Sequence, residues 1–312
     1  MLEVRDLCVQ FPSRDGPICA VNGVSFDLGK SEILGLVGES GSGKSVTGYA
    51  LIGLIDPPGR IVSGSVRFHG EELVGMPEEA MRRIRGRRIA MVFQDPMMTL
   101  NPVLSIETQM VEAVLAHQQT TFEKAKARAI ECLQRVGIAA PERRLAQYPH
   151  QFSGGMRQRV AIAIALLHKP DLIIADEPTT ALDVTVQGQI LHEMQNLVRD
   201  TGAALIWITH DLAVIAGLAD RVAVMYGGRI VEEGAVDAVL DSPRHPYTRG
   251  LLDSVPAAAE PGRPLRPIRG MAPSAARLPA GCAFRARCDR ADDVCVALPE
   301  LAGGVRCHHP LC

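Results

Sequence analysis

Residues 38–45 read Gly38-Glu39-Ser40-Gly41-Ser42-Gly43-Lys44-Ser45, and they match the phosphate-loop pattern G-x-x-x-x-G-K-[ST] at every fixed position. The apolar run at 32–37 predicts a buried strand leading into this loop, and the apolar spacing at 46–55 predicts the helix that leaves it. Glycines let backbone N–H groups turn onto phosphate oxygens, and the start of a helix adds partial positive charge there. The stretch therefore predicts a nucleoside triphosphate site.

The side chains of this loop have separate expected tasks. We expect Lys44 to reach the β- and γ-phosphates and the Ser45 hydroxyl to ligate Mg²⁺. The phosphates would be surrounded by the other loop residues that we assign to the site, which are Gly38, Ser40, Gly41 and Gly43. The alternative is a Gly/Ser turn that binds nothing, and the order of strand, loop and helix makes it the weaker interpretation.

A second apolar run, residues 172–175, ends in two acids, Asp176 and Glu177. A carboxylate at a strand end can hold Mg²⁺, usually through water, so we expect this role for Asp176. Glu177 is then placed to polarise an attacking water. The alternative is a strand capped by surface acids, but the phosphate loop upstream favours the catalytic interpretation.

Ser153, Gly154 and Gly155 stand at the head of a predicted helix over residues 155–168. A hydroxyl, bare backbone amides and a helix N-terminus form a second anion site. One nucleotide does not need two such sites in one chain, but two chains arranged head to tail would use both. The alternative is an ordinary helix cap made by Ser153.

Composition and patterning predict an α/β protein. Short alternating runs within residues 1–28 and at 66–68 predict an antiparallel sheet, and the continuous apolar runs at 172–175 and 204–209 predict a parallel sheet covered on both faces. A net charge of −2 gives no general attraction to nucleic acid or anionic lipid. No signal peptide and no apolar run of spanning length is evident, so we expect a cytoplasmic protein.

The order of these motifs is similar to that in the nucleotide-binding subunits of ABC transporters. The resemblance covers residues 1 to about 250 and rests on this series: the phosphate loop, Gln94, Ser153-Gly154-Gly155-Met156, Asp176-Glu177, Ala181-Leu182-Asp183 and His210. It implies a P-loop ABC-type nucleotide-binding domain over residues 1–250. That domain has a parallel core sheet, an antiparallel β subdomain and an α-helical subdomain at about 95–168.

The resemblance also implies roles for individual residues. Phe11 would stack on adenine, and Gln94 would ligate Mg²⁺ and sense a membrane partner. Asp183 would lie at the seam between two ATPase subunits, and His210 would contact the γ-phosphate. Phe152 departs from the family pattern, where leucine is usual, but it stays apolar.

Residues 242–252 resemble a segment typical of oligopeptide, dipeptide and nickel importer ATPases, and the tail resembles the C-terminal extension of that group, most of all the D-type subunits of dipeptide permeases. The resemblance implies an ATPase that powers import of di- and oligopeptides from the cytoplasmic face of the membrane. The implied partners are a second ATPase subunit, by resemblance a paralogue, two transmembrane permeases and an extracytoplasmic solute-binding protein. Nickel or another small solute remains an alternative. A soluble ABC ATPase acting on nucleic acid is less favoured, because such proteins tend to have two ATPase halves or a coiled-coil arm.

Residues 251–312 combine a Pro-rich linker with a Cys-rich extension. Cys282, Cys288, Cys295 and Cys307 are spaced C-x5-C-x6-C-x11-C. A cytosolic location disfavours disulfides, and structural zinc prefers a tight C-x2–4-C pair. Four thiolates in a looser arrangement suit a [4Fe–4S] cluster, and the resemblance points the same way. Zinc and four unpaired structural thiols stay open as alternatives.

The fourth ligand of this centre is ambiguous, because His308, His309 and Cys312 lie beside Cys307. We expect Arg285, Arg287 and Arg306 to offset the negative charge of a cluster. Every nucleotide-binding motif lies before residue 211, so the sequence also predicts that residues 255–312 are dispensable for nucleotide binding.

Overall fold

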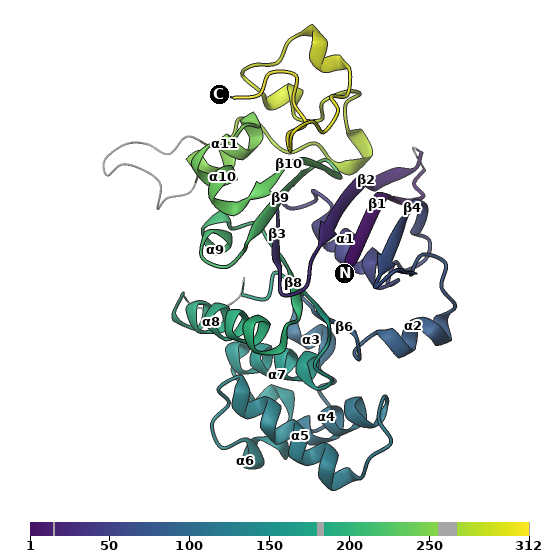
Figure 1. Ribbon diagram of the computed structural model, residues 1–312, viewed down its shortest axis with the longest axis vertical. Helices are drawn as coiled ribbons and strands as arrows, with labels where there is room; N and C mark the ends of the chain where they lie inside the picture. The colour runs from purple at the N-terminus through teal and green to yellow at the C-terminus, as the bar shows by residue number, and fades with distance from the viewer. Residues whose placement is uncertain (15, 180–183, 255–266, 312) are drawn as a thin grey trace. The chain divides into compact units, whose positions relative to one another are not determined.

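An antiparallel sheet carries the alternating N-terminal runs. The computed structural model describes residues 1–14, 16–179, 184–254 and 267–311 (Figure 1). The sheet has the strand order β2-β1-β4-β5, with β1 at Leu2–Phe11, β2 at Ile18–Leu28, β4 at Arg60–Phe68 and β5 at Glu71–Glu72. In β1, Leu2, Val4, Leu7 and Val9 are fully buried, and a register shift between Val4 and Leu7 keeps both ends of the strand facing the core. The predicted antiparallel subdomain is confirmed.

A six-stranded sheet forms the core, in the order β10-β9-β3-β8-β7-β6. Its strands are β3 (Ile33–Val37), β6 (Ile89–Val92), β7 (Leu172–Asp176), β8 (Ala204–Thr209), β9 (Arg221–Tyr226) and β10 (Arg229–Ala235). β3 pairs parallel with β9, and β6 pairs parallel with β7. Every residue of β3, β7 and β8 is buried, as strands covered on both faces require. The predicted hairpin at Gly227-Gly228 joins the antiparallel pair β9 and β10.

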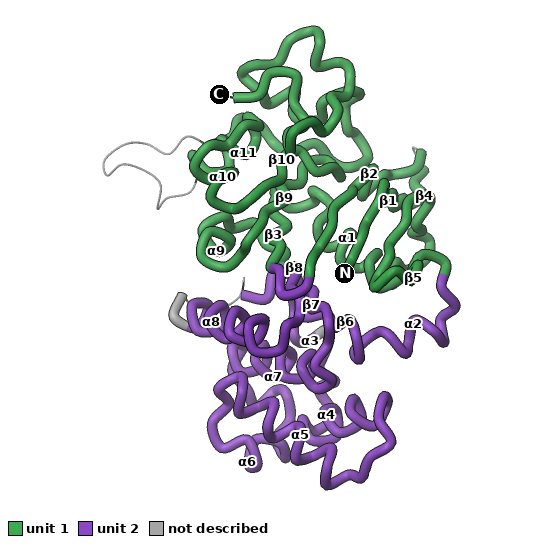
Figure 2. The backbone as a smooth tube through the Cα atoms, in the orientation of Figure 1, with its two compact units in different colours: residues 1–29, 33–75, 207–312 green, residues 30–32, 76–206 purple. Residues whose placement is uncertain are grey.

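The chain divides into two compact units, drawn in different colours in Figure 2. Unit 1 comprises residues 1–29, 33–75 and 207–312, and unit 2 comprises residues 30–32 and 76–206. Unit 1 contains the helices α1 (Lys44–Leu51), α9 (Leu212–Ala216), α10 (Val236–Asp241) and α11 (Pro246–Asp253). Unit 2 contains α2 (Glu78–Ile84), α3 (Pro96–Thr99), α4 (Ile106–Leu115), α5 (Phe122–Arg135), α6 (Pro141–Leu145), α7 (Gly154–Leu166) and α8 (Val184–Thr201).

Helices α3–α7 occupy the stretch predicted as the helical subdomain. The helical pattern read at 106–137 is two helices, because Thr121 caps the second one by accepting from the Lys124 N–H at 3.4 Å. The buried face of α5 consists of Ala125, Ala129, Cys132 and Leu133, at the spacing of one helix face. No helix of the described ranges is both long and apolar enough to cross a membrane.

The C-terminal extension forms short 3-10 turns at η3 (Ala275–Arg277), η4 (Arg285–Arg287) and η5 (Asp293–Val296). Its last part runs along β10. Glu233 donates its N–H to the Gly304 carbonyl at 2.8 Å, and Arg306 donates its N–H to the Val231 carbonyl at 2.8 Å. The Arg306 guanidinium donates to the carbonyls of Ile230 and Pro299, at 3.0 Å each. The boundary predicted after residue 250 falls inside α11, and it stays a prediction.

Candidate functional site

The phosphate loop lies between the buried strand β3 and the first turn of α1. Gly43 has a φ of 102°, and a Cβ there would meet the Ala20 carbonyl, so the turn requires glycine. Lys44 is only 4% exposed, and its ammonium donates to the carbonyls of Gly38 at 2.7 Å and Glu39 at 3.1 Å. The first turn of α1 has no acidic residue. A cation held inside the loop and the positive end of a helix together suit a polyphosphate.

The other site residues predicted in unit 1 occupy separate positions. Ser40 is exposed on the loop, and Ser45 is half-buried in the first turn of α1. Phe11 is the last residue of β1, where its ring lies beside Gly59. His210 is exposed directly after β8 and before Asp211, which caps α9. Their roles remain predictions.

In unit 2, the parallel register of β6 and β7 brings Gln94 and Glu177 together. Val92 pairs with Ala175, so both strands end at the same edge. Asp176, the last residue of β7, is fully buried. The Gln94 side chain donates to the Glu177 carboxylate at 3.4 Å. Glu177 has a φ of 44°, a left-handed conformation that is strained for a residue other than glycine.

Ser153 caps α7 by accepting from the Met156 N–H at 3.3 Å, which is the ordinary contact that the sequence left open as an alternative. Ser153 and Gly154 are both exposed. A Cβ at Gly154 would meet no described atom within 4 Å, so the packing of the described chain does not explain this glycine. Asp183 lies outside the described residues.

The family model of ABC transporters matches residues 21–180. The chain belongs to the ABC transporter family. A second family model, the C-terminal region of oligopeptide/dipeptide transporters, matches residues 231–295. The resemblance noted from the motifs is confirmed, and this ABC ATPase hydrolyses ATP in a reaction coupled to transport.

Curated relatives agree with this assignment. The oligopeptide transport ATP-binding protein OppD of Bacillus subtilis (strain 168) is 51% identical over 289 residues, which are 92% of this chain and 81% of that protein. The dipeptide transport ATP-binding protein DppD of Haemophilus influenzae is 45% identical over 316 residues, covering 100% of this chain and 96% of that protein.

Solved structures agree as well. One is the ATP-binding cassette MJ0796, solved as a dimer in a post-hydrolysis state with ADP and phosphate bound. Its TM-score is 0.68 at 28% identity, over 76% of this chain and 99% of that one. The predicted ABC-type fold is confirmed.

Four of the five cysteines in the extension of this ABC ATPase, Cys282, Cys288, Cys295 and Cys307, line one cavity together with His245. We call this arrangement the cysteine cage. Backbone N–H groups two residues further on donate to three of the sulfurs: Phe284 to Cys282, Arg290 to Cys288 at 3.4 Å, and His309 to Cys307 at 3.4 Å. Burial raises the pKa of these three thiols.

The two histidines that the sequence left open as ligands, His308 and His309, also line the cage, and each makes a further contact. The His308 Nε2 donates to the Ala297 carbonyl at 3.1 Å, and the His309 Nε2 lies 2.8 Å from an Asp292 oxygen. Asp292, Cys295 and His309 are the one described group of three donors within 4.8 Å of one another. Cys307 lines the cage with the other three cysteines, whereas Cys312 lies outside the described residues.

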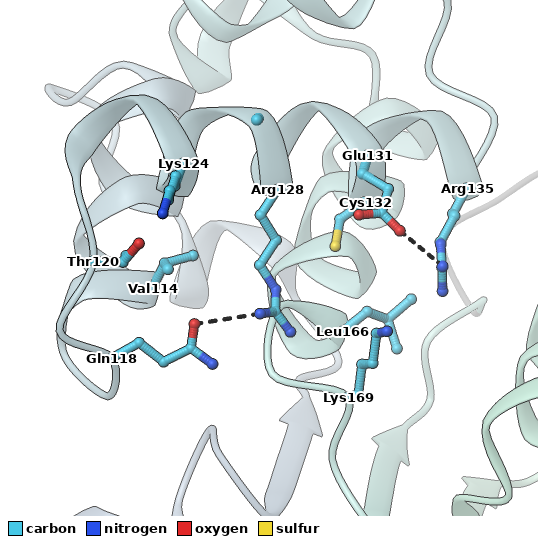
Figure 3. A pocket seen from close by; sticks show the side chains of 11 residues that line it. Val114, Gln118, Thr120, Lys124, Arg128, Glu131, Cys132, Arg135, Leu166 and Lys169 are labelled. Carbon is cyan, nitrogen blue, oxygen red and sulfur yellow. Dashed lines mark hydrogen bonds and ion pairs between the residues drawn. The ribbon is translucent and has the colours of Figure 1, made fainter.

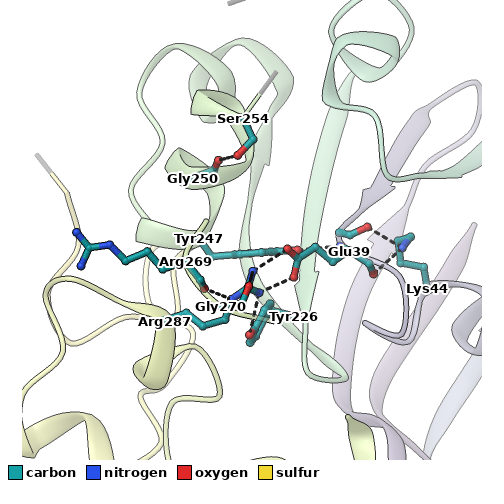
Figure 4. Close-up of polar contacts among 10 residues, drawn as sticks. Glu39, Lys44, Tyr226, Tyr247, Gly250, Ser254, Arg269, Gly270 and Arg287 are labelled. Atoms are coloured by element: carbon teal, nitrogen blue, oxygen red, sulfur yellow. Dashed lines mark hydrogen bonds and ion pairs between the residues drawn. The ribbon is translucent and has the colours of Figure 1, made fainter. Parts of the chain in front are cut away.

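Sequence reasoning missed a contact between the extension and the phosphate loop. Arg287 pairs with the Glu39 carboxylate at 2.6 and 3.0 Å (Figure 4). The role of Arg287 as a counter-charge for a cluster stays a prediction, and the contact that its guanidinium makes is with the loop carboxylate. Arg306 donates to the carbonyls of Ile230 and Pro299, and its role as a counter-charge also stays a prediction. No local signal could have revealed the pair, since its two residues lie 248 positions apart.

A separate hollow in unit 2, of about 460 Å³, has four cationic side chains in its lining (Figure 3). Lys124, Arg128, Arg135 and Lys169 line it, and Arg135 is paired with Glu131 at 2.8 Å. Burial raises the pKa of Cys132, which also lines it, to about 11, so that thiol is protonated at neutral pH. No predicted site residue lines this hollow, and we assign it no role.

Proposed function

We propose that this ABC ATPase powers the import of di- and oligopeptides through a membrane permease. The observation that carries the proposal is the match of residues 231–295 to the C-terminal region of oligopeptide/dipeptide transporters. That region includes the segment 242–252, which carried the resemblance to peptide importers in the sequence. Relatives named for oligopeptide and dipeptide transport, OppD and DppD, support peptide as the solute.

The proposed chemistry uses the residues described above. Lys44 holds the terminal phosphates, Glu177 orients and polarises the attacking water, and His210 contacts the γ-phosphate. Ser45, Gln94 and Asp176 are the residues proposed to hold Mg²⁺, which would neutralise charge on the phosphate oxygens. Phe11 stacks on the adenine ring.

We further propose that each nucleotide lies between two ATPase subunits arranged head to tail. Ser153, Gly154 and Gly155 of one subunit then face the nucleotide held by the other subunit's loop, and Asp183 lies at the seam. The exposure of Ser153 and Gly154 supports this arrangement, as does the absence of any described atom that a Cβ at Gly154 would meet. A glycine that its own chain does not require suits close approach by a partner or ligand.

The proposed assembly contains a paralogous second ATPase subunit, two transmembrane permeases and an extracytoplasmic solute-binding protein, with this chain at the cytoplasmic face of the membrane. To test it, the chain is reconstituted in proteoliposomes with the permeases and binding protein encoded by its neighbouring genes. We expect a dipeptide or short oligopeptide to stimulate ATP hydrolysis and to accumulate with it. Stimulation by Ni²⁺ and not by any peptide would replace peptide by nickel as the solute.

We also propose that the cysteine cage holds a [4Fe–4S] cluster with a structural role. The residues fit such a group, because four thiols share one cavity and backbone N–H groups point at three of the sulfurs. The His245 Nδ1 accepts from the Tyr247 N–H at 3.0 Å, so the neutral ring has its proton on Nε2. That buried Nε2 has no hydrogen-bond partner among the described residues, and a cluster sulfur would accept from it.

The spacing of the thiols favours a cluster over zinc. Tetrahedral zinc with bonds of 2.3 Å places its sulfurs roughly 3.8 Å apart. In the described part of the chain, no three of the cage sulfurs lie within 4.8 Å of one another. Anaerobically purified protein should be brown and contain about four irons per chain. A colourless protein with one zinc per chain would assign the cage to zinc.

A further inference from the structure

Every polar group of Glu39, the second residue of the phosphate loop, has a hydrogen-bond partner within unit 1 (Figure 4). Its N–H donates to the Tyr247 hydroxyl at 2.8 Å, and its carbonyl accepts from the Lys44 ammonium at 3.1 Å. Its carboxylate accepts from both terminal nitrogens of Arg287, at 2.6 and 3.0 Å. The position of Glu39 therefore fixes the shape of the loop and the position of Lys44 together.

Arg287 is built into this position. Its side chain is only 6% exposed, against 29% for Glu39. The guanidinium also donates to the Arg269 carbonyl at 2.8 Å and to the Tyr226 hydroxyl at 3.3 Å. Hydrogen bonding to Glu39 raises the pKa of Arg287, so the guanidinium is charged. A two-pronged, shielded pair of this kind is stronger than an exposed one and fixes geometry as well as charge.

Both residues that hold Glu39 from the C-terminal side adjoin the cysteine cage. Arg287 lies in η4, which is tied to the cage cysteines at both ends: Arg285 donates its N–H to the Cys282 carbonyl at 3.1 Å, and Cys288 donates its N–H to the Arg285 carbonyl at 3.4 Å. Tyr247 follows His245, which lines the cage. A change in the backbone around the cage would therefore reach Glu39 through either residue.

We propose that Arg287 is a positioning residue of the nucleotide site, and that the filled cysteine cage holds it in place. Arg287 keeps the loop in shape and neutralises the Glu39 carboxylate, which would otherwise repel the triphosphate. The role of Arg287 stands on the ion pair alone, whereas its dependence on the cage rests on the proposed cluster.

The first experiment measures the affinity of the full chain for the Mg²⁺ complex of adenylyl imidodiphosphate by calorimetry. We expect Arg287→Met to weaken binding about tenfold, and Arg287→Lys to weaken it less. Arg269→Met is the matched control, because it removes an arginine of the same extension whose ion pair with Asp289 is exposed. That control should bind as the wild type does.

A double variant tests whether the unpaired Glu39 carboxylate causes the loss. In Glu39→Gln/Arg287→Met the unpaired carboxylate is absent, so binding should be tighter than in Arg287→Met alone. If Arg287→Met binds as the wild type does, Arg287 is not a positioning residue. If the double variant binds as weakly as the single one, the unpaired carboxylate does not cause the loss and the charge argument is wrong.

The second experiment compares protein as isolated with protein stripped by an iron chelator. Stripping should weaken nucleotide binding by the wild type but cause no further loss in Arg287→Met. Equal binding by stripped and loaded wild type would overturn the dependence on the cage. Protein that contains no iron as isolated would refute the proposed cluster, and the variant series would still decide the role of Arg287.

Discussion

Glu177 carries the most strained backbone among the proposed catalytic residues. Its φ of 44° lies in a region that costs about 1–3 kcal/mol for a residue with a side chain. Its carboxylate accepts from the Gln94 side chain at 3.4 Å, just after the end of the neighbouring strand. This strain is consistent with a task that a relaxed surface acid at a strand end does not need.

The substitution Glu177→Gln tests that task. It keeps the shape of the side chain and removes the charge that polarises water, so turnover should fall by about 10²–10⁴-fold while ATP still binds. Steady-state hydrolysis and nucleotide affinity measured on the same preparation separate the two effects. Glu193→Gln, a change of the same kind on helix α8, serves as the control. Near-normal turnover in Glu177→Gln would mean that another residue polarises the attacking water.

At this scale the sequence predicts motifs well and pairings poorly. The phosphate loop and the two carboxylates after β7 are recognisable because each needs only a few consecutive residues. Glu39 looks like a variable loop position and Arg287 like one surface charge among several, so nothing in either neighbourhood indicates their ion pair. The same limit applies to Arg306, whose engagement at β10 depends on how the extension returns to the sheet.

The start of α7 shows what one helix end can contribute. Gly154 is exposed and has room for a side chain in its own chain. An acid in the first turn of a helix stabilises that helix, because it faces the positive end of the helix dipole. The same acid would repel a phosphate approaching from another subunit.

Gly154→Asp should therefore leave the melting temperature unchanged or raise it slightly, and still abolish hydrolysis that depends on a partner subunit. Thermal unfolding and ATPase activity in the assembled transporter are the two measurements. Gly188→Asp on α8 is the matched control, since a Cβ there also meets no described atom within 4 Å. Full activity of Gly154→Asp would show that the N-terminus of α7 is not part of the nucleotide site.

A histidine pair joins α4 to the end of α7. The rings of His117 and His168 meet edge to face at 5.0 Å, and the His168 Nε2 donates to the Ala113 carbonyl at 3.0 Å. Burial lowers the pKa of both histidines below the ordinary value of 6.5. The charged groups that face the pair, Arg87 and Arg128, lower it further.

Because both histidines are harder to protonate in the folded state, the unfolded state binds more protons below pH 6.5. The free energy of unfolding should therefore be highest above pH 6.5. It should fall as the pH drops from 6.5 through the lowered pKa values of the two histidines in the folded state. Urea unfolding at pH 7.5 and pH 5.5 measures the difference. His168→Gln keeps a donor for the Ala113 carbonyl and should reduce the pH dependence of the unfolding free energy. An unchanged dependence would show that His168 does not contribute to it.

For the whole molecule, the sequence predicts the architecture but treats the extension as an appendage. Apolar periodicity predicts both sheets and the helical stretch, because burial on one face or two is visible in consecutive residues. Few of the apolar residues in the described part of the extension are buried, and its attachments are contacts to groups far away in the chain. Its link to the phosphate loop is therefore not predictable from local pattern.

Ending the chain after residue 254 should weaken nucleotide binding and lower the melting temperature, in contrast to the dispensable tail that the motifs predict. The truncation removes Arg287 and the Phe284 ring, which packs 5.3 Å from Tyr226 and 5.4 Å from Tyr247. A chain ending after residue 307 keeps these contacts and all four cage cysteines, so it is the control. Unchanged affinity and melting temperature in the chain that ends after residue 254 would show that the extension is dispensable for nucleotide binding and stability.

The antiparallel run of Gly304–Arg306 along β10 has a further consequence, for the behaviour of the protein in solution. β10 is the outermost strand of its sheet, and the extension occupies hydrogen-bonding groups on it that would otherwise be open. An open strand edge recruits strands from other molecules and promotes aggregation. The extension thus acts as a built-in guard against self-association. A preparation that lacks it should scatter light increasingly with protein concentration, even where each molecule remains folded.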